Sequence, residues 1–403
     1  MMSKNSPELR FQGFTDDWEQ RKLGDISYKV KEKNKTGEFT ETLTNSAEYG
    51  IINQRDFFDK DISNAKNLTG YYVVKNDDFV YNPRISNFAP VGPIKRNKLG
   101  KTGVMSPLYY VFRTHDIDKN YLEKYFDTVY WHRFMKLNGD SGARADRFAI
   151  KDSVFVEMPI PYPTIEEQQK IGTFFKHLDD TIALHQRKLD LLKEQKKGFL
   201  QKMFPKNGEK VPELRFAGFA DDWEERKAGD IFKNVSDKGY SDLPVLSASQ
   251  ELGMIRRDEI GIDIKYDEAS TKNYKRVQPG QFVIHLRSFQ GGFAWSDIEG
   301  ITSPAYTVLD YKEPNRYNSD FWKVVLTSPT FITRLETVTY GIRDGRSISY
   351  TDFSSLKLTA PSLAEQQQIG TFFAHLDTLI SLHQRKLDLL KELKKALLRQ
   401  LFV

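Results

Sequence analysis

Residues 167–204 read EQQKIGTFFKHLDDTIALHQRKLDLLKEQKKGFLQKMF, and residues 365–402 repeat this segment with 27 of 38 positions identical. In both copies apolar residues recur at alternating spacings of three and four, which is the heptad pattern of a coiled-coil seam. The first copy places this seam at Ile171, Phe174, Leu178, Ile182, His185, Leu189, Leu192, Lys196, Phe199 and Met203. The pattern predicts two long helices, each about 37 residues and, at about 1.5 Å per residue, about 55 Å long.

A narrow apolar seam on so long a helix needs a partner, and the nearest partner is the other copy. Two such helices, each leading out of its own domain, are expected to pair antiparallel, with the two domains at opposite ends. The seam histidines, His185 and His383, are candidates for a metal site together with His177 and His375. However, positions 177 and 185 lie about 12 Å apart along a helix, too far to share a zinc ion bound at about 2 Å. Polar seam residues are therefore expected to set the register, and no metal is predicted.

The beginnings of the two halves are also repeated. Residues 7–26, PELRFQGFTDDWEQRKLGDI, match residues 212–231 at 16 of 20 positions. Between the repeated ends the sequences diverge, but landmarks such as Ser106-Pro107-x-Tyr109 and Ser303-Pro304-x-Tyr306 keep their order. This organisation predicts four segments: a first domain at 1–163, a long helix at 164–205, a second domain at 206–361 and a second long helix at 362–403.

The divergent middles predict an α+β fold, in which two similar domains with mixed sheet and helices are joined by the coiled coil. Segments rich in β-branched and aromatic residues predict strands at 71–74, 79–81, 108–112, 282–286 and 305–309. Helical spacing of apolar residues predicts helices at 120–136 and 319–336, the second despite Pro329.

The composition is that of a globular protein in a reducing compartment. The 403 residues contain no cysteine and no apolar run near the roughly 18 residues that a membrane span needs. The beginning of the sequence lacks the apolar stretch of a secretory signal, so a cytoplasmic location is expected. The net charge of +5 is small beside 60 basic and 55 acidic residues, so the distribution of charge is more informative than its sum.

Two stretches in matching places carry basic residues without any acidic one, at 84–113 and 269–296. Paired arginines follow in each half, in Gly142-x-Arg144-x-x-Arg147 and Gly341-x-Arg343-x-x-Arg346. Such residues could grip phosphates or guanine edges, but they could equally be solvated or hold a loop through an ion pair. The candidate DNA-binding residues are Arg84, Lys95, Arg96, Lys98, Lys101, Arg144, Arg147, Lys272, Lys275, Arg276, Arg287, Arg343 and Arg346.

No catalytic motif is complete. Gly100-Lys101-Thr102 resembles the end of a phosphate-binding loop, but Lys95 occupies the position of its first glycine. Asn82-Pro83-Arg84 lacks the second proline and the aromatic residue with which amino methyltransferases hold a flipped adenine. Zinc-protease and nucleophile-elbow motifs are missing as well. The sequence predicts that the chain is not an enzyme and has no catalytic residues.

The combination of PELRF-x-GF-x-x-DWE-x-RK-x-GDI at the start of each half, Ser-Pro-x-Tyr within it and EQQ-x-IGTFF in each long helix resembles the specificity subunit family of type I restriction-modification systems. The resemblance covers essentially the whole chain. It implies two target recognition domains that each read one half of a bipartite, asymmetric DNA site, separated by helices that form an antiparallel coiled coil.

The same resemblance implies partners. Two modification subunits, which bind S-adenosylmethionine and methylate adenine N6, would dock on this subunit, and restriction subunits would add ATP- and Mg-dependent translocation and cleavage. No cofactor is then expected on this chain. Two alternatives remain open: a coiled-coil adaptor with two protein-binding domains, and a stand-alone DNA-binding regulator. Only the regulator would bind tightly and specifically without modification subunits.

Overall fold

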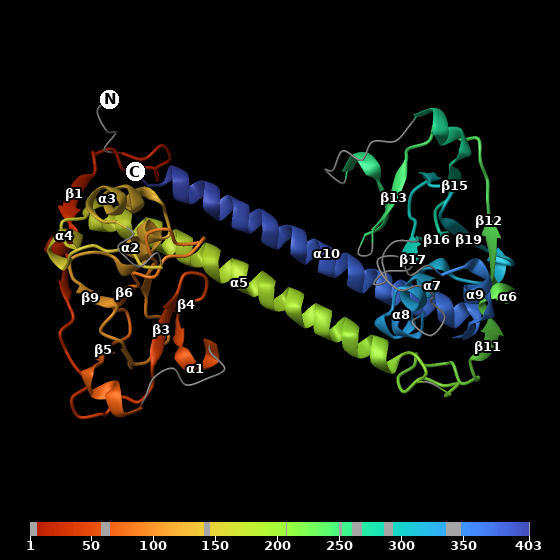
Figure 1. The fold of residues 1–403 in the computed structure, drawn as a ribbon, viewed down its shortest axis with the longest axis horizontal. Helices are drawn as coiled ribbons and strands as arrows, with labels where there is room; N and C mark the ends of the chain where they lie inside the picture. The colour runs from red at the N-terminus through yellow and green to blue at the C-terminus, as the bar shows by residue number, and fades with distance from the viewer. Residues whose placement is uncertain are drawn as a thin grey trace. The chain divides into compact units, whose positions relative to one another are not determined.

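A computed structural model describes residues 6–57, 65–140, 146–206, 208–249, 252–259, 268–285, 293–335 and 348–402 (Figure 1). The chain divides into two compact units, and the first combines two segments that are far apart in the sequence. The first unit comprises residues 1–186 and 385–403, and the second comprises residues 187–384. Each long helix therefore contributes one stretch to each unit.

The first half of the chain begins with the strands and short helices of the first domain and ends in the first long helix. Its elements are β1 (Glu19–Lys22), η1 (Leu23–Asp25), β2 (Ser27–Lys29), β3 (Leu43–Ser46), β4 (Gly50–Asn53), α1 (Gln54–Phe57), η2 (Ala65–Gly70), β5 (Tyr72–Val74), β6 (Phe79–Tyr81), β7 (Ile94–Arg96), β8 (Gly103–Met105), β9 (Tyr110–Thr114), α2 (Lys119–Phe126), α3 (Tyr130–Asn138), α4 (Asp152–Phe155), β10 (Pro159–Tyr162) and α5 (Ile165–Lys202).

The second unit repeats this order. Its elements are β11 (Glu224–Lys227), α6 (Ala228–Ile231), β12 (Phe232–Val235), β13 (Leu246–Ser249), β14 (Gly253–Arg256), η3 (Arg257–Glu259), η4 (Glu268–Asn273), β15 (Lys275–Val277), β16 (Phe282–Ile284), β17 (Phe293–Trp295), β18 (Gly300–Thr302), β19 (Thr307–Tyr311), η5 (Pro314–Arg316), α7 (Ser319–Leu326), α8 (Pro329–Leu335), α9 (Tyr350–Ser355), β20 (Lys357–Ala360) and α10 (Leu363–Gln400).

The sheets of the two units have the same topology. A four-stranded antiparallel sheet runs β2-β9-β6-β7 in the first unit and β12-β19-β16-β17 in the second. Two-stranded pairs repeat as well, with β1-β10 matched by β11-β20 and β5-β8 matched by β15-β18. The register is also equivalent, since Phe79 faces Arg96 across β6 and β7 while Phe282 faces Trp295 across β16 and β17. The predicted α+β fold with two similar domains is confirmed.

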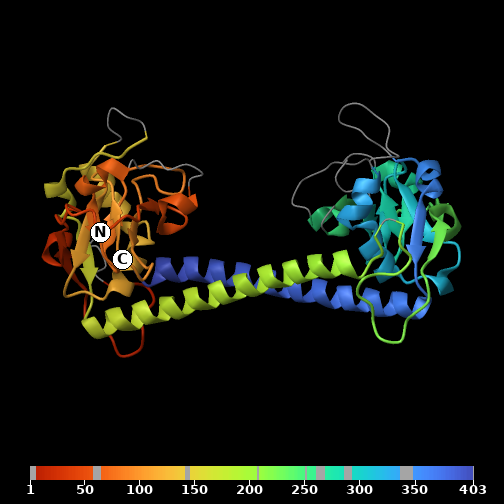
Figure 2. The same cartoon turned by 90° about the horizontal axis from the view of Figure 1, so that it is seen from below.

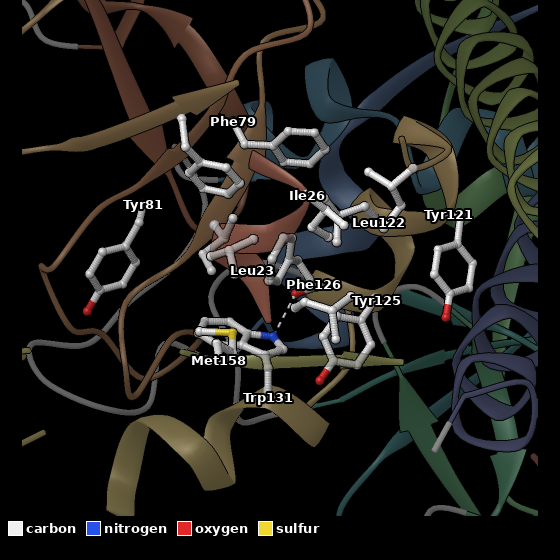
Figure 3. Close-up of a cluster of buried hydrophobic side chains, with 14 of the residues drawn as sticks. Leu23, Ile26, Phe79, Tyr81, Tyr121, Leu122, Tyr125, Phe126, Trp131 and Met158 are labelled. Carbon is white, nitrogen blue, oxygen red and sulfur yellow. Dashed lines mark hydrogen bonds between the residues drawn. The ribbon is translucent and has the colours of Figure 1, made fainter. Parts of the chain in front are cut away.

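The two predicted middle helices are interrupted, which corrects the sequence-based expectation. In place of a helix over 120–136, α2 ends at Phe126 and α3 begins at Tyr130. The Thr128 hydroxyl donates to the Tyr125 carbonyl, and the Trp131 indole donates to the Phe126 carbonyl at 3.2 Å (Figure 3). These bonds use carbonyls that a continuous helix would need. In the second unit the break between α7 and α8 falls just before Pro329.

Aromatic side chains fill the core between the four-stranded sheet and α2 (Figure 3). Phe79 on β6 and Phe112 on β9 are fully buried and stack at 5.5 Å between ring centroids. Tyr121 and Phe126 on α2 belong to the same cluster. The second unit has an equivalent cluster around Phe232, Phe282, Phe321 and Trp322. Burial of such side chains is the main source of stability of each unit.

Both long helices are continuous over 38 residues (Figure 1, Figure 2). In the first unit the beginning of α5 packs on the end of α10, as the 6.2 Å centroid distance between Phe175 and Phe402 shows. In the second unit the end of α5 packs on the beginning of α10, through Phe199 and Phe372 at 4.9 Å. Within each unit the helices are therefore antiparallel, as expected for two helices that each lead out of their own domain.

A buried carboxylate near the start of each long helix holds the repeated first segment of its half. The side chain of Glu167 is fully buried and accepts hydrogen bonds from Arg10 at 2.7 and 2.9 Å and from the Trp18 indole at 3.1 Å. Arg215 donates to Glu365 in the same bidentate way, at 2.7 and 2.8 Å. The identical residues at the ends of the halves are thus contact partners.

We expect Glu167→Ala to destabilise the first unit by about 3 kcal/mol, because the Arg10 cation would lose its partner in a mostly buried position. Hydrogen exchange measured peptide by peptide on the full chain should show faster exchange in the first unit only. Glu365→Ala should do the same in the second unit. Glu194→Ala, at an exposed position of α5, is the control. Equal acceleration in both units by Glu167→Ala would contradict a local role.

Candidate DNA interface

Two loops of the first unit bring Arg84 and Arg147 together, although the two residues are 63 positions apart in the sequence. They face each other across an antiparallel bridge. The Ile85 amide donates to the Asp146 carbonyl at 3.0 Å, and the Phe148 amide donates to the Pro83 carbonyl at 2.8 Å. The side chain of Arg84 is 65% exposed, and the Asp146 carboxylate lies 3.6 Å from it. An exposed ion pair with so long a separation adds little to the stability of the fold. Arg84 can therefore exchange Asp146 for another anion at a small free-energy cost.

The loop that carries Arg84 connects β6 to β7 and is fixed at both ends. Asn82 donates from its side chain to the Asn45 carbonyl at 2.8 Å, and its amide donates to the Pro93 carbonyl at 2.9 Å. At Gly92 φ is +82°, and a Cβ there would lie 2.1 Å from the Asn82 carbonyl oxygen. Only glycine fits this close approach, so the loop has one defined path.

Three of the predicted cations, on and just after β7, lie against carboxylates of α2 and of the residue that follows it. Lys95 pairs with Asp127 at 2.9 Å, and Lys98 pairs with Glu123 at 3.0 Å. Arg96 is only 9% exposed and lies 2.7 Å from Glu123. The stretch is free of acidic residues in the sequence, but α2 supplies them in space. Whether these three residues contact DNA stays a prediction.

The carboxylates of α2 belong to a larger charge network that reaches both long helices. Lys124 is 5% exposed and lies 2.9 Å from Asp127 and 2.8 Å from Asp179 of α5. Lys394 of α10 lies 2.7 Å from Asp179. Burial acts to lower the pKa of Lys124, but the surrounding carboxylates raise it overall. Burial acts to raise the pKa of Asp127, but Lys124 and two further lysines lower it overall. Both groups are therefore held in their charged forms.

Four further predicted residues lie elsewhere on the two units. Lys101 pairs with Glu41 in the first unit. In the second unit Arg276 pairs with Glu299, and Lys275 donates to the Tyr306 carbonyl at 2.6 Å. Burial, followed by repulsion from Lys238, lowers the pKa of Lys275. Lys272 at the end of η4 is exposed. The other predicted residues, Arg144, Arg287, Arg343 and Arg346, lie outside the described residues.

Equivalent positions of the two units carry different chemistry. Arg96 on β7 and Glu123 on α2 form an ion pair in the first unit. The equivalent residues in the second unit are Trp295 on β17 and Lys323 on α7, and the ammonium group lies 4.1 Å from the indole ring centre. The contact is kept while the charge on the helix is reversed. The scaffold is therefore shared, and the side chains that it presents differ.

A cavity of about 720 Å³ opens on the first unit beside the Arg84 loop. Pro83 and Phe148, which also pair the two loops, form part of its wall. Two apolar side chains, Leu108 and Leu137, line it and are 59% and 74% exposed. The motif search could not find them, because an exposed leucine has no distinctive pattern in a sequence.

The family model for the type I restriction modification DNA specificity domain matches this chain twice, at residues 15–194 and 220–392. The chain belongs to the type I restriction-modification DNA specificity family. The two matches correspond to the two halves of the repeat, so the family predicted from the repeated motifs is confirmed.

Relatives and a solved structure of this specificity family agree. The chain is 21% identical to the type I restriction enzyme MjaVIII specificity subunit of Methanocaldococcus jannaschii, over 99% of this chain and 95% of that protein. It is 27% identical to the MjaIX specificity subunit of the same organism, over 45% of this chain and 41% of that one. A crystal structure of the S subunit of a type I system from M. genitalium has the same fold, with a TM-score of 0.62, 13% identity and 99% coverage of both chains.

Among the described residues, no helix is long and apolar enough to cross a membrane. Within the same residues, no group of three or more His, Cys, Asp or Glu side chains is arranged to hold a metal ion.

The charge network gives this specificity-family chain a predictable response to acid. Because the pKa of Asp127 is lowered in the folded state, its stabilising effect is complete above its ordinary pKa near 4 and is lost as the pH falls through the lowered value. We expect Asp127→Asn to destabilise the first unit by about 2 kcal/mol at pH 7. The difference from wild type should shrink below about pH 4.

Thermal unfolding between pH 7 and pH 2.5 measures this convergence. Asp16→Asn is the control, because Asp16 is exposed on the same unit. A stability difference that stays constant across the whole pH range would show that Asp127 does not act through its charge.

Proposed function

We propose that this chain is the non-catalytic DNA-recognition subunit of a cytoplasmic type I restriction-modification enzyme. Each unit reads one part of a bipartite, asymmetric DNA target. The chain also recruits modification subunits, which methylate adenine N6 with S-adenosylmethionine, and restriction subunits, which use ATP and Mg. In this proposal none of these cofactors binds to the chain itself.

The observation that carries the proposal is the matched pair of scaffolds with different chemistry. The two units share strand order and register, yet the Arg96–Glu123 pair of one corresponds to Trp295 and Lys323 in the other. Two scaffolds of one kind can engage DNA in one way, while different side chains select different bases. Such a pair suits an asymmetric target with two dissimilar halves.

The exposed Arg84 and the half-buried Arg147 support DNA as the ligand. Arg84 has a weakly held carboxylate partner, and backbone pairing places Arg147 beside it. Two arginines placed beside each other by backbone pairing suit the closely spaced charges of a phosphate backbone. By contrast, Lys95, Arg96 and Lys98 already have carboxylate partners. We therefore assign DNA contact first to Arg84 and Arg147.

Co-expression with the neighbouring modification subunit in a methylation-free host tests the proposal. Modification-sensitive sequencing should reveal N6-methyladenine in a two-part motif only when both proteins are present. Either protein alone is the matched control. If the assembled complex, supplied with S-adenosylmethionine, yields no methylated motif, the result favours the alternative hypothesis of a coiled-coil adaptor with two protein-binding domains. Tight, specific DNA binding by this chain alone would favour the stand-alone regulator.

Exposed leucines on the long helices suggest where modification subunits bind. In the first unit Leu184 of α5 and Leu389 of α10 are 61% and 68% exposed. Each lies five residues from the contact between Asp179 and Lys394, in the same direction along the helix pair. They therefore lie at the same height along the helix pair. Both occupy heptad position c, which neighbours position g, so they lie on the same flank of the pair. The second unit repeats the arrangement with Leu382 and Leu191, which are 60% and 51% exposed.

A helix with an apolar stripe is the partner that such a flank fits, because it would extend the helix pair into a bundle. We expect the double variant Leu184→Glu and Leu389→Glu to reduce the co-purified modification subunit by about half, since charged residues are disfavoured at the centre of an apolar interface and the equivalent flank of the second unit stays intact. The fold should be unaffected, because both side chains are exposed.

Glu194→Arg, on the solvent-facing side of α5, is the matched control and should leave co-purification unchanged. Undiminished capture of the modification subunit by the double leucine variant would exclude this flank as its docking surface.

A further inference from the structure

The most exposed aromatic side chain among the described residues belongs to Phe88, in the loop between β6 and β7. Its exposure is 81%, compared with 62% for Tyr49 and 53% for Tyr28. Its neighbours Ala89 and Val91 are buried and fill the interior beneath the loop. Phe88 therefore contributes little to the core, and its side chain is available for a ligand.

The backbone around Phe88 is fixed in one conformation. Ser86 and Ala89 exchange two backbone hydrogen bonds of 3.1 Å each, which leaves only Asn87 and Phe88 at the tip of a tight turn. The Tyr81 hydroxyl donates to the Val91 carbonyl at 2.9 Å, and this bond anchors the chain just after the turn. A side chain presented from so constrained a turn loses little backbone entropy when it binds.

The charges beside this turn indicate which ligand it fits. Arg84 lies two residues before the turn, and Arg147 pairs with it across the antiparallel bridge. Arginine side chains next to an exposed ring match the two surfaces of DNA, because guanidinium groups bind phosphates while an aromatic ring packs against bases. An apolar protein surface would satisfy Phe88 but would offer the two arginines no phosphate to replace the weakly held Asp146 carboxylate.

We propose that Phe88 contacts the bases of the DNA half-site read by the first unit and helps to determine its sequence. The inference rests on the proposed function and adds a specificity-determining residue to it. The ring enters a groove and packs against apolar base edges or between bases, while Arg84 and Arg147 hold the flanking phosphates. Phe88 lies inside the acid-free basic stretch at 84–113, but it is not among the candidate DNA-binding residues because these are all charged.

The test compares Phe88→Ala, Phe88→Leu and Arg84→Ala in the complete complex with the modification subunit. Phe88→Ala should lower methylation of the wild-type motif at least about tenfold and make one or two positions of one half-site degenerate. The other half-site should keep its sequence. Phe88→Leu should retain part of the activity because it keeps an apolar contact. Val129→Ala, at a position 68% exposed on the same unit, is the matched control and should match wild type.

Binding to a DNA duplex that carries the wild-type motif, measured over a range of salt concentrations, separates base contact from phosphate contact. Phe88→Ala should weaken binding without changing the salt dependence, whereas Arg84→Ala should reduce the slope of log K against log salt by about 1. An unchanged motif and methylation rate for Phe88→Ala would overturn the inference. So would weaker binding with a reduced salt slope and an unchanged motif.

These outcomes differ from those expected if the proposed function is wrong. If it is wrong, the wild-type complex itself gives no two-part motif. Thermal unfolding of each variant verifies that the turn still folds, as expected for a side chain that lies almost entirely in solvent.

Discussion

A carboxylate without solvent exposure needs both a cation and hydrogen-bond donors nearby, and each unit is organised around one such group. Glu167 accepts hydrogen bonds from Arg10 and Trp18, and Glu365 accepts them from Arg215. The next residue of each helix, Gln168 or Gln366, accepts from the backbone amide just before α2 or α7. The first turns of a long helix therefore fix both the beginning of the half and the helix that covers its sheet.

The close packing at this point explains the glycine shared by both helices. A Cβ on Gly172 would lie 2.9 Å from the Tyr121 amide nitrogen, and one on Gly370 would lie 2.8 Å from that of Phe321. Neither helix could approach its neighbour as closely with a larger residue. The carboxyl ends of the long helices also bind the repeated first segments. The Leu9 amide donates to the Gln400 carbonyl, and the Leu214 amide donates to the Lys202 carbonyl. Residues identical between the halves are thus those that assemble a unit from distant segments.

The sequence predicts well what depends on periodicity and poorly what depends on distant pairing. The heptads locate α5 and α10, and aromatic and β-branched runs locate β6 and β16. The edge pair β1-β10 is missed, because its exposed strand Glu19–Lys22 consists of charged and polar residues. Counting charges along the sequence finds a basic stretch at Lys95 and Arg96. Only the fold shows that Glu123 and Asp127 approach it from α2.

This charge pairing has a consequence for the loop that carries Arg84. The loop ends at β7, where Lys95 contacts Asp127; Lys124 contacts both Asp127 and Asp179 of α5. The position of the loop relative to this stretch of α5 is thus set through buried charges, which tolerate little displacement. In the second unit Val324 and Thr327 occupy the positions equivalent to Lys124 and Asp127, so apolar packing makes the equivalent connection. The ion pair between the long helices is kept in both units, as Asp179 with Lys394 in the first and Asp377 with Lys196 in the second, while the link from helix to sheet differs.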